Sequence, residues 1–448
     1  MRCVAQTDEG RITFPAPWYA WLTVAVLFVA YIFSFIDRMI LSLLVEPMKR
    51  DLVLTDTQFS LLQGFAFAIL YTFAGLPLGR LIDRTNRIRI VALGVGFWSV
   101  MTSVCGLVGN YWQLFLARIG VGVGEATLSP AAYSIFADSF EPRRLGLALV
   151  VYNVGAAVGA GIAMMIGGYV VEAVSTMDDV VLPIVGQIHA WQLTFLIVGP
   201  PGIVVAILVA LLREPKRHGG LRGTSSEKLV SIPLREVVDF VRQHRVSLGL
   251  HHFGVAVAHM AAFGAISWTP VLLVRVHHWP ADRIGMAMGI ALIVGGVLGF
   301  IGGGWLGDVL ARRHPTVGRL KVGLIAALVA LPAAVVFSVQ PNPYVTVILL
   351  AVLYMCAAGN LPSAIAVLNE LAPNQMRAQL SALFLFTINL IGLGLGATLV
   401  AICSDYIFTG ETGLRYSLVV MTPIGYLLSA ILFRLSFRPF EHSIALQN

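Results

Sequence analysis

Long apolar segments recur along the whole chain, and they restrict its possible folds more than any other feature. Most reach about 20 residues, the length that an α-helix needs to cross the hydrocarbon core of a bilayer. Only 12% of the 448 residues are charged, whereas a soluble domain has about 25%. The segments also lack the polar–apolar alternation of outer-membrane barrel strands. The sequence therefore predicts an all-α polytopic membrane protein.

We expect twelve transmembrane helices. In the seventh, Trp268, Thr269 and Pro270 predict a break near the outer end. The helices are placed at residues 18–45, 57–82, 88–108, 111–138, 145–170, 191–212, 246–274, 284–307, 320–339, 343–371, 377–403 and 415–435.

Basic residues are unequally distributed between the two sides of these helices. With both termini on one side, 23 of the 30 Lys and Arg residues lie on that side and five lie in the opposite loops. Because Lys and Arg accumulate in cytoplasmic loops, we expect both termini in the cytoplasm. Asp8 and Glu9 precede the first predicted helix, so we expect no cleavable signal peptide. The net charge of +7 then reflects topology, and we expect no binding to nucleic acid.

A short motif occurs once in each half of the chain. GRLIDRTNR (79–87) follows the second predicted helix, and GWLGDVLAR (304–312) follows the eighth. Both read Gly-x-Leu-x-Asp, with an Arg four residues after the Asp. Because about half the chain length separates the two copies, we expect two six-helix halves of one design. The residues of interest are Gly79, Asp83, Arg84, Arg87, Gly304, Asp308 and Arg312.

The chain is accordingly divided into five parts. We expect a cytoplasmic tail (1–17), an N-terminal bundle (18–212), a cytoplasmic linker (213–245), a C-terminal bundle (246–436) and a second cytoplasmic tail (437–448). Within the linker, the apolar residues of segment 234–241 share one helical face, opposite its charged residues. This pattern predicts a short amphipathic helix, and both a location on the membrane surface and a solvated linker fit it.

Two acids and two arginines lie well inside the predicted helices, where each costs at least about 2.5–3.5 kcal/mol unless it faces a cavity or a partner. Asp37 and Arg38 lie in the first helix, and Arg118 and Glu125 share one face of the fourth. At 1.5 Å per residue, both arginines lie about 10 Å below the outer boundary, and Glu125 lies about 10 Å deeper. We expect Asp37 to pair with Arg118, leaving Arg38 for Glu125 or an anionic ligand. A purely structural pairing of the two helices is the alternative.

The two halves, the repeated loop motif and REPKR after the sixth helix resemble the major facilitator superfamily of secondary transporters. Within it, FIDRMILS (35–42) and RIGVGVGEATLSPAAYSIFAD (118–138) resemble the spinster-like subfamily. This resemblance implies a bacterial member, so we expect a bacterial inner membrane as the location. Asn86 stands where the superfamily loop has Gly, and Asn tolerates a left-handed backbone better than most residues. Gly159-Ala160 replaces the Gly-Pro of the superfamily's antiporters, so the resemblance does not establish antiport.

This resemblance implies two pseudo-symmetric bundles that rock around a central site and expose it to each side in turn. It implies that the first and fourth helices line the cavity, and that the loop motif gates the cytoplasmic side with Arg87 near Asp138. The mirrored gate is Asp308, Arg312 and Glu370. A pair of charges at that surface is worth about 0–1 kcal/mol, which suits a gate that must open.

We expect a proton-coupled transporter of an amphipathic anion such as a lysophospholipid or a sphingoid phosphate, because animal members of the subfamily export such lipids. Asp37 and Glu125 would carry the proton, since a poorly hydrated carboxylate can take one near neutral pH when its Arg partner withdraws. The predicted substrate-binding residues are Arg38, Arg118, Tyr152, Asn153, Asn360 and Asn389.

Other functions remain open from the sequence. A transporter of a small organic anion, such as a sugar acid, would hold the carboxylate with Arg38 or Arg118, and a non-transporting sensor could share the fold. A membrane di-iron enzyme would need clustered histidines, whereas the pairs at 251–252 and 277–278 lie at opposite ends of one predicted helix. We expect no enzymatic activity and hence no catalytic residues, no metal or cofactor apart from protons as the coupling ion, and a monomer in the lipid bilayer.

Overall fold

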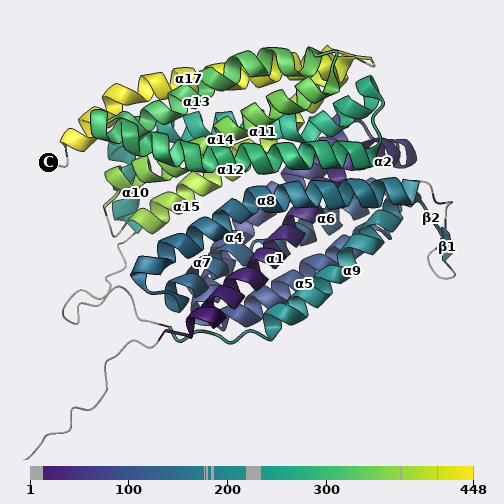
Figure 1. Ribbon diagram of the computed structural model, residues 1–448, viewed down its shortest axis with the longest axis horizontal. Helices are drawn as coiled ribbons and strands as arrows, with labels where there is room; N and C mark the ends of the chain where they lie inside the picture. Colours follow the sequence, from purple (N-terminus) through teal and green to yellow (C-terminus); the bar gives the residue numbers. More distant parts are fainter. Residues whose placement is uncertain are drawn as a thin grey trace, which may run out of the picture.

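The computed structural model describes residues 14–446 except 176, 178–179, 183–185, 218–233, 374–375 and 411, and at a few helical positions, Asp83 among them, only the backbone. The helices form two bundles that lie side by side (Figure 1). We call the end that the Lys and Arg distribution predicts to be cytoplasmic the inner end, at the left of Figure 1, and the opposite end the outer end.

The N-terminal half contains the first six spans. A two-stranded antiparallel hairpin, in which Val181 pairs with Gln187, connects the fifth and sixth spans and was not predicted. The elements are α1 (Pro17–Leu43), α2 (Val45–Leu52), α3 (Asp56–Ser60), η1 (Leu61–Phe65), α4 (Ala66–Arg84), α5 (Arg87–Cys105), α6 (Tyr111–Glu125), α7 (Leu128–Ser139), α8 (Pro142–Ser175), β1 (Val180–Leu182), β2 (Gly186–Ile188) and α9 (Ala190–Ala210).

The C-terminal half follows a helix in the linker, α10 (Leu234–Gln243). Val237 of this helix is buried in an apolar cluster with residues of the C-terminal half, so α10 packs against that half. The remaining elements are α11 (Arg245–His277), α12 (Ala281–Arg313), α13 (Gly318–Val336), η2 (Phe337–Val339), α14 (Pro343–Leu371), α15 (Arg377–Ile388), η3 (Asn389–Leu395), α16 (Gly396–Ile402), η4 (Cys403–Ile407) and α17 (Gly413–Ala445).

The prediction of twelve spans is confirmed. In the described part of the chain, ten helices are long and apolar enough to cross a membrane. The other two spans are interrupted: residues 56–84 contain the π-helical turn η1, and residues 111–139 bend at Ala126 and Thr127 between α6 and α7. Such π-helical turns commonly lie at functional sites.

Two predicted helix ends are wrong. Helix α11 continues through Pro270 to His277 instead of breaking. Its outer part is held by the neighbouring span, because Trp268 Nε1 donates a hydrogen bond of 2.8 Å to the carbonyl of Ala397. Helix α17 continues well beyond the predicted end at residue 435, and Phe440 within this extension is buried.

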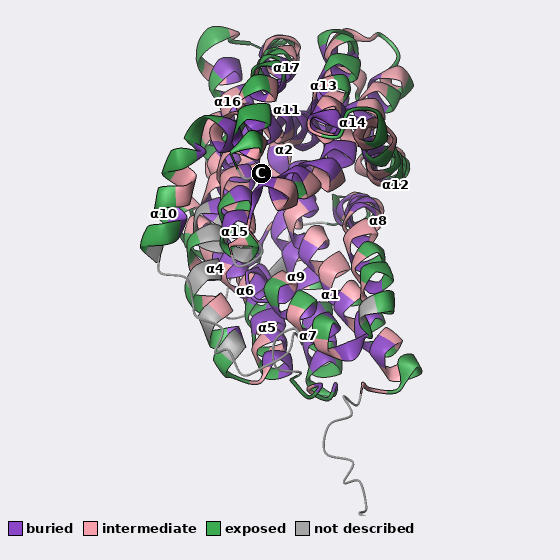
Figure 2. Cartoon of the chain, turned by 90° about the vertical axis from the view of Figure 1, so that its left-hand side faces the viewer, coloured by how far each residue is buried: buried purple, intermediate pink, exposed green. Residues whose placement is uncertain are grey.

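The two halves contact each other along α8 and α12, which lie side by side in both views (Figures 1 and 2). Glycines allow this approach at the outer end: a Cβ atom added to Gly168 would lie 2.8 Å from the Cα of Gly285. Towards the inner end of α12, a Cβ atom at Gly302 would meet nothing within 4 Å. The small residues therefore join α8 and α12 from the outer end to the middle of α12, where a Cβ atom on Gly296 would overlap with the Cβ of Ala157.

Gly285→Leu should separate the outer ends of the two halves. Helix axes lie about 8–10 Å apart depending on the side chains between them, so a leucine should widen this contact by about 2 Å. The measurement is the distance between spin labels at Trp112 and Tyr416, which are exposed outer positions of the two halves. Gly302→Leu, the same change on the same helix, is the control, and equal distances in both variants would show that this contact does not set the separation.

Candidate functional site

The charged residues of α1 and α6 meet in the N-terminal half. Glu125, the last residue of α6, accepts hydrogen bonds on Oε2 from Ser34 Oγ at 2.6 Å and from Arg38 Nε at 2.7 Å. Arg38 Nη2 lies 2.5 Å from the same oxygen. The Glu125 side chain is fully buried, and the Arg38 side chain is 17% exposed. The carboxylate is thus neutralised and fixed by two residues one helical turn apart on α1.

The other carboxylate oxygen of Glu125 is uncommitted. Oε1 is buried and has no hydrogen-bond partner among the described residues. A carboxylate oxygen can accept hydrogen bonds or take up a proton. Glu125 therefore combines a committed oxygen, held by Arg38 and Ser34, with a second oxygen at which a proton, a water molecule or a ligand group can bind.

Arg118 and Asp37 are neighbours, but not as the predicted ion pair. Arg118 Nη1 donates to the main-chain oxygen of Asp37 at 3.1 Å, and Nε and Nη2 have no partner in the described part of the structure. The Asp37 carboxylate, also buried, interacts electrostatically with Glu125, Arg118 and Arg38. The expectation of an Asp37–Arg118 side-chain pair is wrong for this conformation, because the guanidinium bonds to the peptide backbone. Of the two partners expected for Arg38, Glu125 or an anionic ligand, Glu125 is the one that Arg38 contacts.

A break in the fourth span fixes the position of Glu125. Helix α6 ends at this residue, and Thr127 turns its hydroxyl back onto the carbonyl of Gly124 at 2.8 Å. Two glycines let α5 pack against this segment: a Cβ atom on Gly94 would lie 2.9 Å from the Gly124 carbonyl, and one on Gly124 would lie 2.8 Å from the Gly94 carbonyl. The glycine-rich sequence around Glu125 thus serves close helix packing.

The predicted binding residues of α8 are already engaged. Tyr152 is fully buried and stacks on Tyr31 with ring centroids 4.8 Å apart. Asn153 donates from Nδ2 to the carbonyl of Leu149 at 2.8 Å and accepts from the hydroxyl of Tyr133 at 2.8 Å. These contacts all lie within the N-terminal half.

The other two predicted binding residues are asparagines of the C-terminal half. Asn360 on α14 is buried, and its Nδ2 has no hydrogen-bond partner among the residues described. Asn389 is the first residue of η3, a π-helical turn in the eleventh span. Both remain predicted binding residues.

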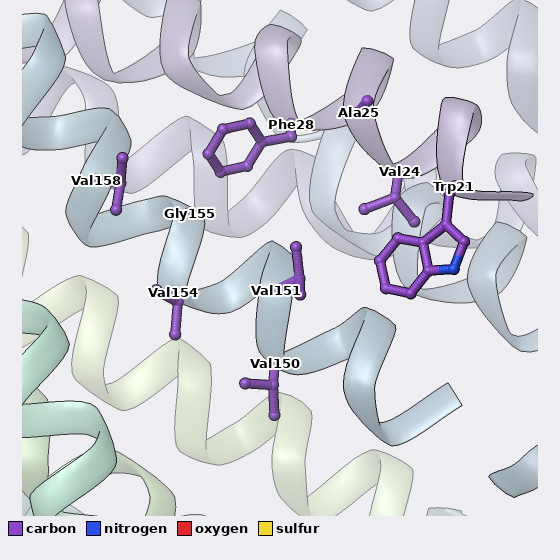
Figure 3. Close-up of a pocket in the computed structure, with 9 residues that line it drawn as sticks. All are labelled: Trp21, Val24, Ala25, Phe28, Val150, Val151, Val154, Gly155 and Val158. Atoms are coloured by element: carbon purple, nitrogen blue, oxygen red, sulfur yellow. The ribbon is translucent and has the colours of Figure 1, made fainter. Parts of the chain in front are cut away.

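An apolar groove of about 500 Å³ lies between the inner halves of α1 and α8 (Figure 3). On α1, Phe28 lies about ten residues from Arg38, which corresponds to about 15 Å along the helix. Between them, the rings of Tyr31 and Phe35 have centroids 5.1 Å apart. The guanidinium carbon of Arg38 lies 5.4 Å from the centroid of the Phe35 ring. The groove is lined by Trp21, Val24, Ala25, Phe28, Val150, Val151, Val154, Gly155 and Val158.

At the inner end, Arg87 is the centre of a cluster within the N-terminal half. Its buried guanidinium pairs with Asp138 at 2.5 Å, as expected, and with Glu214 at 2.6 Å. Glu214 was not predicted, although it belongs to the REPKR segment after the sixth span. Asp83, the third expected member, lies outside the described side chains.

The turn before Arg87 also differs from the expectation. Asn86 adopts φ −72° and ψ 112° rather than a left-handed conformation. Its side chain accepts a hydrogen bond of 2.9 Å from the amide of Arg89, so it caps the N-terminus of α5. Arg84 of the same motif is exposed. A Cβ atom at Gly79 would meet nothing within 4 Å, and one at Gly304 would meet only Pro362 at 3.9 Å.

In the C-terminal half the arginine of the mirrored cluster is Arg319. It lies 3.3 Å from Asp308 and pairs with Glu370, whereas the predicted Arg312 is exposed and makes no ion pair with a described residue. The spacing between arginine and acid identifies the equivalent residue. Arg87 precedes Asp138 by 51 residues, and Arg319 precedes Glu370 by the same 51 residues. Helix α12 continues five residues past Asp308, whereas α4 ends one residue past Asp83, and the loop after α12 is also longer. Together these differences move the arginine past the end of the repeated motif.

Two six-helix bundles, with buried acids and arginines facing each other from the first and fourth spans, define a membrane transporter. The family model of the Major Facilitator Superfamily matches residues 27–397, so the chain belongs to this family. Within it, the protein is spinster-like.

Solved structures and named relatives support this assignment. A bacterial homologue of the human lysosomal transporter spinster, in inward-facing unoccupied and occupied conformations, superimposes with TM-scores of 0.79 and 0.80; both structures are 25% identical and cover 96% of this chain and 99% of theirs. An MFS-type efflux pump of Mycolicibacterium smegmatis is 29% identical over 98% of both chains. A probable L-galactonate transporter of Escherichia coli is 24% identical over 72% of this chain and 70% of its own.

Arg319→Ala should lower the melting temperature more than Arg312→Ala. Arg319 holds two carboxylates at the inner end, and partly exposed ion pairs are worth about 0–1 kcal/mol each. A loss of about 1 kcal/mol lowers Tm by about 2–4 °C. Thermal unfolding in detergent compares the two variants, and an equal or larger loss in Arg312→Ala would show that the arginine of the sequence motif contributes at least as much to stability.

Proposed function

We propose that this protein works by alternating access and couples the movement of a proton to that of an amphipathic anion. The observation that carries the proposal is the environment of Glu125: a fully buried carboxylate whose Oε2 is held by Arg38 and Ser34 while Oε1 is uncommitted. Charges this deep in a transmembrane bundle commonly mark a substrate or proton pathway.

The charge balance of the cluster favours joint binding of a proton and an anion. Asp37 and Glu125 balance Arg38 and Arg118. An anion that takes over Arg38 leaves Glu125 without its cation, and a buried carboxyl group without a cation is more stable with a proton. Conversely, a proton on Glu125 releases Arg38 for the anion. Since each ligand favours the other, the coupling is reciprocal and corresponds to co-transport rather than exchange.

The groove between α1 and α8 supports an amphipathic substrate. An acyl chain spans about half of the roughly 30 Å hydrocarbon core, which matches the distance of about 15 Å along α1 between Phe28 and Arg38. An anionic head at Arg38 and a tail in the groove would therefore fit one lipid-like molecule. Phe35 and Tyr31 provide apolar contacts between the two ends.

A small organic anion is the second candidate substrate. It is favoured by the similarity to a probable L-galactonate transporter and to a probable galactarate/D-glucarate transporter of Bacillus subtilis, which is 23% identical over 75% of both chains. Such a substrate would use the same arginines and the amide of Asn360, but it would leave the apolar groove empty.

The location follows from the basic residues. We place the inner end with both termini in the cytoplasm because Lys and Arg cluster at that end. We place the protein in a bacterial inner membrane because bacterial transporters are among its relatives. We propose a monomer with no cofactor other than the coupled proton. In the described part of the chain, no group of three His, Cys, Asp or Glu side chains is placed to hold a metal ion.

Glu125→Gln should abolish the response of transport to a pH gradient while leaving the protein folded. Glutamine keeps the size and the acceptor oxygen for Arg38, but it cannot bind or release the proton. The measurement is flux into liposomes with and without an imposed pH gradient, with Glu141→Gln, an exposed glutamate of the inner end, as the control.

Asp37→Asn, in the same assay, distinguishes the contribution of Asp37 to proton coupling from that of Glu125. The main-chain oxygen of Asp37 keeps its bond to Arg118 in this variant, so any change reports the carboxylate charge. If Glu125→Gln and Asp37→Asn both respond to the gradient as the unmodified protein does, neither acid carries the proton, and the cluster is a structural lock.

Removal of Arg38 should weaken binding of an anionic amphipath by roughly 10–100-fold, the worth of a hydrogen bond to a charged group. Arg38→Ala alone would leave Glu125 buried and unpaired, which costs about 3–5 kcal/mol. The test is therefore made in the Glu125→Gln background, with Arg313→Ala, an exposed arginine, as the control. Binding of a lysophospholipid with an anionic head is compared with that of a neutral one.

A groove variant distinguishes the two substrate classes. Ala25→Trp fills the space between α1 and α8 and should reduce binding of the lysophospholipid, but not of a sugar acid. Equal affinity for neutral and anionic amphipaths, in the presence and absence of Arg38, would contradict the assignment of the head group to this arginine.

A further inference from the structure

Asp405, at the outer end of the eleventh span, binds the N-terminus of a helix in the other half. Its carboxylate accepts hydrogen bonds from the amide of Thr57 at 2.7 Å, from the amide of Asp56 at 3.3 Å and from the hydroxyl of Thr57 at 2.6 Å. Asp56 is the first residue of α3, which begins the second span. An acid of the C-terminal half thus caps the second span of the N-terminal half.

Glu172 makes the reciprocal contact. It lies near the outer end of α8, the fifth span, and accepts a hydrogen bond of 3.0 Å from the amide of Ala281, the first residue of α12. Helix α12 begins the eighth span and has no side-chain cap of its own at Pro280. In each half, therefore, the fifth span ends in an acid that caps the second span of the other half.

Further ion pairs surround the cap at α3. Asp56 is buried and pairs with Lys49 of its own half and with Arg275 of the other half, the latter at 2.9 Å. Ser404, next to the capping Asp405, donates to Asp56 at 3.1 Å. These residues line a polar cavity of about 590 Å³ at the outer end. The contacts that Arg275, Ser404 and Asp405 make to α3 cross between the two halves, so they exist only while the halves touch there.

The first amides of a helix have no partner within the helix and carry a partial positive charge, so a carboxylate satisfies both needs at once. If the outer ends separate, Ala281 loses its acceptor and Asp405 loses two amide donors. The two contacts belong to different pairs of elements, α8–α12 and α3–η4. Opening of the outer end must break both.

We propose that Glu172 and Asp405 are gating residues that hold the outer end closed by capping helices of the opposite bundle. This inference rests on the alternating access of the proposed function, but it does not depend on the substrate or on the coupling ion. Each cap stabilises the outer-closed conformation. Loss of a cap frees the start of the second span in the opposite half, α3 or α12.

Glu172→Ala and Asp405→Ala should each raise the ratio of outer-open to outer-closed molecules by about fivefold, the typical effect of losing a helix cap. The double variant should show roughly the product, because the two caps share no residue. Spin labels at Trp112 and Tyr416 report the outer separation in the full-length protein in nanodiscs. A second pair at Arg143 and Arg313, exposed positions of the inner end, reports the inner separation.

The inner pair distinguishes gating from local loss of structure. Removal of a gating residue should shorten the inner distance as the outer distance lengthens. Fraying of a helix end would leave the inner distance unchanged. Asp405→Glu and Glu172→Asp, which keep the carboxylate, should restore much of the closed population. Asp282→Asn is the matched control, because Asp282 lies in the first turn of α12 and, among the described residues, bonds only to the adjacent amide of Arg283.

Two other outcomes would each overturn a different statement. If the unmodified protein populates both conformations and the double variant leaves their ratio unchanged, the caps do not gate the outer end, and the present inference fails alone. If the inner and outer distances never change in opposite directions, in any variant or with substrate, the alternating access of the proposed function fails.

Discussion

A charge inside the hydrocarbon region is stable only where neighbouring groups neutralise it, and this constraint determines how the N-terminal half is built. Glu125 needs Arg38 and Ser34, so α1 must lie against the end of α6. The break after Glu125 and the glycines that bring α5 close serve the same contact. The buried Arg118 guanidinium is in turn directed at the backbone of α1. Removing one partner of such a cluster costs far more than removing both, so its members depend on one another.

The two ends of the molecule use charge in different ways. At the inner end, Arg87 and Arg319 each bind acids of their own half or of the adjoining linker. At the outer end, Arg275 and Asp405 bind residues of the opposite half. The inner clusters can therefore persist as rigid bodies when the halves move. The outer contacts depend on the relative position of the halves and report the conformation, which here is closed at the outer end.

The sequence predicts the spans and the neighbourhood of the four buried charges, because helix length and depth follow from a fixed rise per residue. It predicts the contact of Arg38 with Glu125 as one of two possibilities, but it does not predict the partner of Arg118. Arg118 binds a main-chain oxygen, and no sequence pattern marks which carbonyl is accessible. The constant spacing of the loop motif predicts Arg312 as the mirrored arginine, but the longer α12 and the longer loop after it move the structural equivalent to Arg319. The outer caps were missed for the same reason as Arg118, since their donors are backbone amides.

The cap at α3 also has a consequence for biosynthesis. Asp405 is made 349 residues after Asp56, which at roughly 5–20 residues per second means about 20–70 s of translation. Until then the start of the second span depends on its own capping box, in which Thr55 and Gln58 exchange hydrogen bonds. The N-terminal half can therefore enter the membrane with this helix end formed. The acceptor for the amides of Asp56 and Thr57 arrives only with the eleventh span, so the outer seal is among the final contacts that the nascent chain can complete.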